Sequence, residues 1–175
     1  DAKIRLHIKV RKVEAGGSRM NEVLRQEKKY LINIVDSRKL CARLDKVMKE
    51  DKHNGLYGYR IRSLYFDRPD DGYFWDKVDG MELRRKIRLR NYGPSTDFAM
   101  LEMKQKEGAY QKKRSLPVRK KDAMELCRGN YTPLLAYGEG FAAEFYGLMN
   151  SMCYRPRAVV EYRRMAYVAK ENRIR

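Results

Sequence analysis

The stretch KIRLR, from Lys86 to Arg90, most strongly constrains what this chain can fold into. Successive side chains of a β-strand point to opposite faces, so Ile87 and Leu89 would share one face. Lys86, Arg88 and Arg90 would then lie side by side on the other. Three neighbouring cations repel one another, so the pattern predicts a strand whose second face binds something anionic.

The same alternation recurs along the chain, in six predicted strands. A solvent-facing sheet surface also alternates, and this alternative stays open for each single strand. Solvent faces usually mix both signs of charge, however, whereas Glu27 and Glu102 are the only acids among these positions. The groups that we expect to share a face are Arg25, Glu27 and Lys29; Arg60 and Arg62; Lys86, Arg88 and Arg90; Glu102, Lys104 and Lys106; Lys112 and Arg114; and Tyr162 and Arg164.

The order of predicted elements indicates an α+β fold. Short connections, GPST and EG, join three consecutive strands, and connections of this length favour antiparallel pairing. If the charged faces point inward, the sheet curls into an antiparallel β-barrel, a tunnel lined with cations and flanked by helices. We predict strands at 23–35, 59–67, 81–92, 97–106, 109–118 and 155–170, and helices at 36–50, with Asp36 or Ser37 as N-cap, 73–78, 120–129 and 138–152.

The composition points to phosphate-rich partners. Forty Lys plus Arg against 23 Asp plus Glu give a formal net charge of +17. Such a charge suits nucleic acid, nucleotides, polyphosphate or an anionic membrane surface. Arginine forks also match phosphate oxygens in pairs.

Three widely spaced cysteines, Cys41, Cys127 and Cys153, form no CxxC motif, which favours reduced thiols in the cytoplasm. No apolar run approaches the ~20 residues that span a bilayer. We expect a soluble cytoplasmic chain, with any membrane association left to other domains or subunits. The sequence does not indicate an oligomeric state.

The first residues stand apart from the rest. A GGS sequence at 16–18 resembles a linker, and Met20 could be an initiator. We interpret 1–19 as a separate N-terminal segment that could have been added to the natural chain, and 20–175 as one domain.

Six motifs in that domain resemble a known family. RQEKKYLI, IRSLYFD, KIRLRNYG, LEMKQK, the KKR of QKKRSL, and EYRRMAY resemble, in order and spacing, the VTC domain. This is the polyphosphate polymerase branch of the triphosphate tunnel metalloenzymes, or CYTH-like superfamily. The resemblance implies an antiparallel tunnel that binds ATP with Mn²⁺ or Mg²⁺ and transfers the γ-phosphate to a growing polyphosphate chain.

The resemblance also implies roles for individual residues. Catalytic roles fall on Lys29, Arg88, Arg90, Lys104, Lys112 and Arg164. Further phosphate contacts fall on Arg25, Arg62, Lys86, Lys106, Arg114, Tyr162, Arg173 and Arg175. Glu27 and Glu102 are the metal-ligand candidates.

One departure from the family pattern leaves other functions open. Family members continue beyond this point with further lysine-bearing strands and a metal-binding glutamate, so we expect the C-terminal part of the tunnel to be missing here. The alternatives are a tripolyphosphatase of the same fold and a non-catalytic domain that binds polyphosphate or inositol polyphosphate. Nucleic acid is disfavoured as a partner, because the chain carries no RNP-like or other recognition motif.

Overall fold

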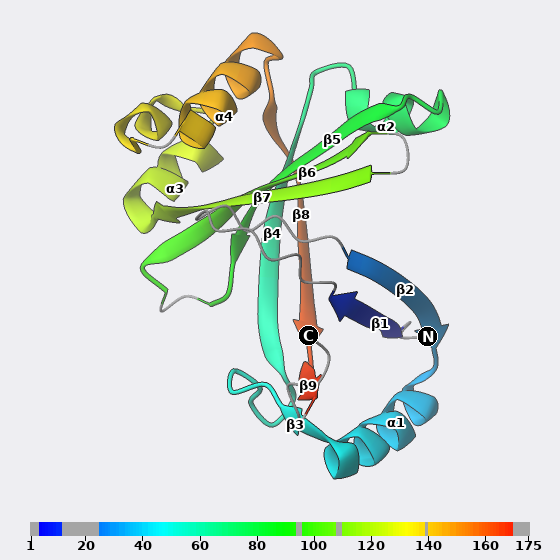
Figure 1. Cartoon of the computed structure of the whole chain (residues 1–175). Helices are drawn as coiled ribbons and strands as arrows, with labels where there is room; N and C mark the ends of the chain where they lie inside the picture. Colours follow the sequence, from blue (N-terminus) through cyan, green and yellow to red (C-terminus); the bar gives the residue numbers. More distant parts are fainter. Residues whose placement is uncertain (1–3, 12–24, 94–95, 108–109, 139, 170–175) are drawn as a thin grey trace. The chain divides into compact units, whose positions relative to one another are not determined.

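A computed structural model describes residues 4–11, 25–93, 96–107, 110–138 and 140–169 of the 175-residue chain (Figure 1). The chain divides into two compact units. The first unit comprises Asp1–Tyr59 and Arg163–Arg175, and the second unit comprises Arg60–Tyr162. Each unit is described by itself below.

A five-stranded sheet forms the framework of the second unit. Its strands lie in the order β7-β6-β5-β4-β8 (Figure 1). The pairs β4–β5, β5–β6 and β6–β7 are antiparallel. The strand bounds are β4 Tyr59–Asp67, β5 Leu83–Asn91, β6 Phe98–Glu107, β7 Tyr110–Arg119 and β8 Arg155–Arg164.

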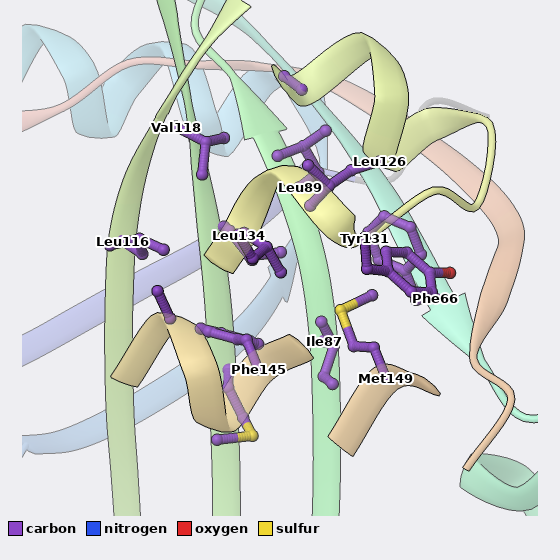
Figure 2. Packing of buried hydrophobic residues seen from close by; sticks show 14 of the residues in the cluster. Phe66, Ile87, Leu89, Leu116, Val118, Leu126, Tyr131, Leu134, Phe145 and Met149 are labelled. Carbon is purple, nitrogen blue, oxygen red and sulfur yellow. The ribbon is translucent and has the colours of Figure 1, made fainter. Parts of the chain in front are cut away.

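Helices cover one face of this sheet. Their buried side chains, including Leu126, Leu134 and Phe145, pack against the strands (Figure 2). On the sheet, Leu89 of β5 lies opposite Leu101 of β6, which in turn lies opposite a leucine of β7. The helical elements of the second unit are α2 Gly72–Val78, α3 Lys120–Cys127, the 3-10 helix η1 Thr132–Ala136 and α4 Gly140–Ser151.

The hydrophobic core between helices and sheet fixes the orientation of strands β4, β5, β6 and β7. Burying a large apolar side chain contributes about 1.5–3 kcal/mol, and many such side chains here are fully buried. A strand shifted by one residue would expose all of them, because side chains alternate between the faces. The core therefore determines which side chains are left for the opposite face.

Within the described residues, the first unit contains two antiparallel ladders and one helix. Strand β1, Ile4–Arg11, pairs with β2, Arg25–Ile32. Strand β3, Met48–Glu50, pairs with β9, Tyr167–Ala169. Helix α1 spans Ile34–Val47.

Most of the predicted elements are confirmed, with local differences. Helix α1 begins at Ile34, and Asn33, not Asp36 or Ser37, caps it, because Asn33 Oδ1 accepts from the Asp36 amide at 2.8 Å. The end of the helix predicted at 36–50 is wrong, since Met48–Glu50 form strand β3. The strand predicted at 155–170 is interrupted at Met165 and Ala166, between β8 and β9. Strand β1 and helix η1 are additional to the predicted elements.

The α+β class with antiparallel sheets is confirmed. Among the described residues, the strands form one five-stranded sheet and two two-stranded sheets, and no pairing that closes a barrel is present. β1 lies within the 1–19 segment that the sequence sets apart.

Gly58 is predicted to be indispensable to the first unit. It has φ +75°, and a Cβ added there would lie 2.2 Å from the backbone oxygen of Arg164. Gly80 has a similar φ of +66° with nothing within 4 Å of an added Cβ. Left-handed backbone alone costs about 1–2 kcal/mol for a non-glycine residue, and the clash adds about 1–3 kcal/mol. Gly58→Ala should therefore destabilise more than Gly80→Ala.

The measurement is urea unfolding of both variants followed by circular dichroism. Equal losses of unfolding free energy in the two variants would show that the close approach at Arg164 imposes no constraint.

Candidate functional site

The face of the sheet opposite the helices carries closely spaced charged side chains. Arg88 lies opposite Tyr65 of β4 and Glu102 of β6, and all three point away from the core. We call this surface the cationic face. By strand alternation it comprises Ser63 and Tyr65 of β4, Arg84, Lys86, Arg88 and Arg90 of β5, Glu102, Lys104 and Lys106 of β6, and Lys113 and Ser115 of β7.

Glu102 is the centre of the cationic face. Its Oε2 lies 2.6 Å from Arg88 Nε and 3.7 Å from Arg90 Nη1, and its Oε1 lies 2.6 Å from Lys113 Nζ. The carboxylate is 4% exposed. Burial raises the pKa of Glu102, but the attraction of Arg88, Arg90 and Lys113 outweighs it and the pKa is lowered overall. Glu102 is therefore a buried anion that holds three cations from two neighbouring strands.

Tyrosines hold the two guanidinium groups in place. Arg88 Nη1 donates to the Tyr65 hydroxyl at 3.0 Å, and Arg90 Nη1 donates to the Tyr92 hydroxyl at 3.4 Å. Burial lowers the pKa of Arg88, but its contacts with Glu102 and Tyr65 prevail and the pKa is raised. Arg88 thus remains charged at any physiological pH, with its guanidinium fixed in one orientation.

A row of three lysines crosses the cationic face next to the arginines. Lys86 lies directly opposite Lys104, and Lys104 lies directly opposite Lys113. Like charges directly opposite each other destabilise a sheet. The Lys86 ammonium lies 3.8 Å from the centre of the Tyr73 ring of α2, and Lys113 contacts Glu102. The face thus gathers cations from three adjacent strands, an arrangement suited to a multivalent anion.

Lys112 and Arg114 are not on the cationic face, which corrects the sequence prediction. Arg114 lies opposite Met103, a core residue, and therefore points toward the helices. Its guanidinium is bidentate to Glu144 of α4, with Nη2 2.6 Å from Oε1, and stacks 4.6 Å from the Phe141 ring centre. Lys112 alternates with Lys113 and shares the face of Arg114.

Arg62 is also misplaced by the sequence prediction. It lies opposite Asn91, on the face that Leu64 and Phe66 share, and its Nη2 lies 2.6 Å from Glu161 Oε2. Arg60 contacts the same carboxylate at 3.4 Å. Ser63 and Tyr65 occupy the positions on the cationic face that the prediction gave to β4 arginines.

The remaining predicted residues divide between the two units. Tyr162 follows Glu161 in β8 and so points to the face of the sheet that carries Arg88. Arg164 belongs to the first unit. Arg25, Glu27 and Lys29 lie in β2 of the first unit, where the structure describes only their backbone. Arg173 and Arg175 lie outside the described residues.

The structure thus brings together Lys86, Arg88, Arg90, Lys104, Lys106 and Glu102 as predicted, and adds residues that the prediction missed. Lys113, Tyr65 and Ser63 are the additions. Tyr65 and Ser63 carry a signal in the alternation of IRSLYFD. Lys113 carries no such signal. It lies in a run of three consecutive cations, KKR, and only the pairing register decides which of them point to which face.

Glu102 does not fit the predicted role of metal ligand. Both of its oxygens already contact cations, and a metal ion would have to displace or approach them. In the part of the chain that the structure describes, no three His, Cys, Asp or Glu side chains come together as a metal site. Of the two candidates, Glu27 alone keeps that role as a prediction.

The second unit therefore defines a class of protein, a helix-backed antiparallel sheet whose other face gathers arginines and lysines. Comparison with protein families identifies which one: the VTC domain model matches residues 24–175, and the chain belongs to this family. Membership indicates a polyphosphate-related role. A comparison with curated proteins returned no match. None of the helices within the described ranges has the length and apolar character to cross a membrane.

Glu102→Gln should destabilise the fold, because it leaves Arg88, Arg90 and Lys113 without their buried counter-charge. Breaking a buried ion pair in this way costs about 3–5 kcal/mol. Because the pKa of Glu102 is depressed in the folded state, its stabilisation is present above the unfolded pKa of about 4.3 and is lost as pH falls through the folded pKa. The difference in unfolding free energy between wild type and variant should shrink on acidification.

Urea titrations at several pH values measure this difference. Glu125→Gln is the control, since Glu125 pairs only with its helix neighbourhood at the surface. A Glu102→Gln variant as stable as the control variant at neutral pH would contradict the anchoring role.

Lys113→Met should weaken binding of inorganic tripolyphosphate roughly tenfold, whereas Lys112→Met should leave it nearly unchanged. Both substitutions remove one charge from adjacent positions of β7, but only Lys113 lies on the cationic face. A charge-assisted contact contributes about 1.5–3 kcal/mol, which sets the magnitude. Isothermal titration calorimetry decides between them. A larger loss of affinity in Lys112→Met than in Lys113→Met would indicate that Lys112 contacts the phosphate, as the sequence predicts.

Proposed function

We propose that this chain belongs to a polyphosphate polymerase, which transfers the γ-phosphate of ATP to a growing polyphosphate chain. The observation that carries the proposal is the row of like-charged lysines beside the Arg88–Glu102–Arg90 cluster. Positive charges in a row across adjacent strands attract a chain of phosphates, whose negative charges recur along its length. The VTC family match supports the same class of ligand.

The proposed reaction needs no nucleophile from the protein. A terminal oxygen of the polyphosphate chain attacks the γ-phosphorus of ATP, the bond from that phosphorus to the β–γ bridging oxygen breaks, and ADP leaves. Catalysis of such a transfer rests mainly on positioning and on neutralising charge that develops on the phosphoryl oxygens. Arg88 and Arg90 are the groups suited to hold these oxygens, because their orientations are fixed by Tyr65, Tyr92 and Glu102.

The lysines have a different role in this proposal. Lys86, Lys104 and Lys113 offer point charges at similar spacing across neighbouring strands. An ammonium group imposes little geometry on its partner, unlike the planar guanidinium. A polyphosphate chain could therefore move along this row while the arginines keep the reacting phosphate in place.

Two parts of the proposal rest on the family match. The sheet is proposed to be one wall of a closed antiparallel tunnel, to which Lys29, Arg164, Arg173 and Arg175 contribute further cations. Mn²⁺ or Mg²⁺ would neutralise charge on the substrate oxygens when bound, with Glu27 as the proposed protein carboxylate.

A non-catalytic domain that binds polyphosphate or inositol polyphosphate is the second candidate. The saturation of Glu102 by three cations favours it, because the cationic face then offers affinity for phosphate without a carboxylate ready for a metal. In this reading ligand binds without turnover.

Arg88→Ala should abolish product formation, while Arg85→Ala should retain it. Both substitutions remove an arginine from β5, but Arg85 points to the other face, where it contacts Gln105 at 3.4 Å. Removing a guanidinium that stabilises a phosphoryl transition state costs a factor of about 10³ or more. The measurement is incubation of the natural full-length protein with ATP and Mn²⁺, with products resolved on a gel stained for polyphosphate.

Long polymer that disappears in Arg88→Ala alone would support the polymerase. Orthophosphate without polymer would identify a triphosphatase, and tight binding without turnover would identify a binding domain. Equal loss in both variants would show that Arg88 acts through folding and not through the site.

A further inference from the structure

We propose that Ser63 Oγ and Arg90 Nε form a buried subsite that binds oxygen atoms of one phosphate group. This inference rests on the proposed function, in that it assumes a phosphate chain on the cationic face. Ser63 is 1% exposed and Arg90 is 6% exposed. Ser63 Oγ and Arg90 Nε are both buried and, within the described part of the chain, neither has a hydrogen-bond partner.

The two atoms come from directly opposed residues. Ser63 of β4 and Arg90 of β5 are partners in the antiparallel ladder, so their side chains lie on the same face. Directly opposed residues have Cβ atoms about 4.5–5.5 Å apart. One phosphate group, with several oxygens, can therefore accept from both.

Their unpaired state is costly in the free protein. Buried polar side chains are bonded in the large majority of cases, and leaving one unbonded costs about 1–3 kcal/mol. Two such groups side by side therefore indicate a place that a ligand completes. Both can donate, so the missing partner is an acceptor with more than one lone pair.

The Arg90 guanidinium is already engaged at its Nη1 end. Its Nη1 contacts Glu102 and the Tyr92 hydroxyl, at 3.7 and 3.4 Å. These contacts hold the far end of the group and leave the Nε edge for another partner. Arg88 differs, because its Nε is 2.6 Å from Glu102. The two arginines are thus unequal, and Arg90 is the one prepared for a ligand at Nε.

Access to the two buried atoms requires a neighbouring side chain to change rotamer, and Tyr92 lies beside Arg90. Its ring lies 5.8 Å from the Arg90 guanidinium carbon, its hydroxyl contact is long, and the residue is 38% exposed. Exposed side chains change rotamer within nanoseconds, and Glu102 still holds Arg90 Nη1 when Tyr92 moves.

A hydroxyl donor predicts a distinctive dependence on salt. Removing a cation from a polyanion site reduces the number of counterions released on binding and so flattens the salt dependence. Ser63 carries no charge. Its loss should weaken binding by the same factor at every salt concentration.

The test compares Ser63→Ala with Ser151→Ala, which makes the same change at an exposed position of α4, on the side of the sheet opposite the cationic face. Affinity for inorganic tripolyphosphate is measured by calorimetry at several salt concentrations, and the melting temperature of the free protein is measured for each variant. Ser63→Ala should bind roughly tenfold more weakly, with an unchanged salt slope. Its free form should melt at the wild-type temperature or above, because an unbonded buried hydroxyl has been removed. Ser151→Ala should match wild type in both measurements.

Wild-type affinity in Ser63→Ala would overturn the subsite and leave the proposed function intact. A lower melting temperature with unchanged affinity would also overturn it, since Ser63 would then have a structural partner such as a buried water. A wild-type protein that does not bind tripolyphosphate would overturn the proposed function and the subsite with it.

Discussion

The ion-pair cluster around Glu102 is the interaction on which the cationic face depends. Arg88 and Arg90 from β5 and Lys113 from β7 meet at one carboxylate of the strand between them. Without that anion, three positive charges on adjacent strands would repel one another at short range in a poorly solvated place. With it, the side chains are held in fixed positions. Glu102 therefore does for the free protein part of what an anionic ligand would do for the complex.

The charge on this face can be tolerated because the other face supplies the stability. The apolar residues of β5, β6 and β7 pack under α3, η1 and α4 (Figure 2). That core determines the pairing register of the strands. The register in turn determines on which face of the sheet each charged side chain lies. Arg114 is the opposite case, a charged residue that the register places on the face under the helices. On the helix-covered face it is neutralised by Glu144 and stacked on Phe141, so it serves packing.

The sequence predicted the faces of the central strands correctly and the faces of the charged residues in β4 and β7 wrongly, for a physical reason. KIRLR contains two apolar and three cationic residues in strict alternation, so its faces can be assigned without a partner. QKKRSL offers three cations in a row, and only pairing with β6 decides that Lys113 faces Glu102. In IRSLYFD, Arg62 looked like the functional position because it is charged. The register instead gives that face to Ser63 and Tyr65.

The buried polar groups without a hydrogen-bond partner do not contribute to the stability of the fold. Arg88 and Arg90 are two positions apart on one strand. Arg88 Nε donates to Glu102, whereas Arg90 Nε has no hydrogen-bond partner among the described residues. A protein optimised only to fold would place an acceptor there or an apolar side chain in place of Ser63. Retaining both donors makes sense when a ligand supplies the acceptor. In the proposed subsite, the free energy that the two unbonded donors cost the free protein becomes part of the affinity for phosphate, because binding supplies their partners.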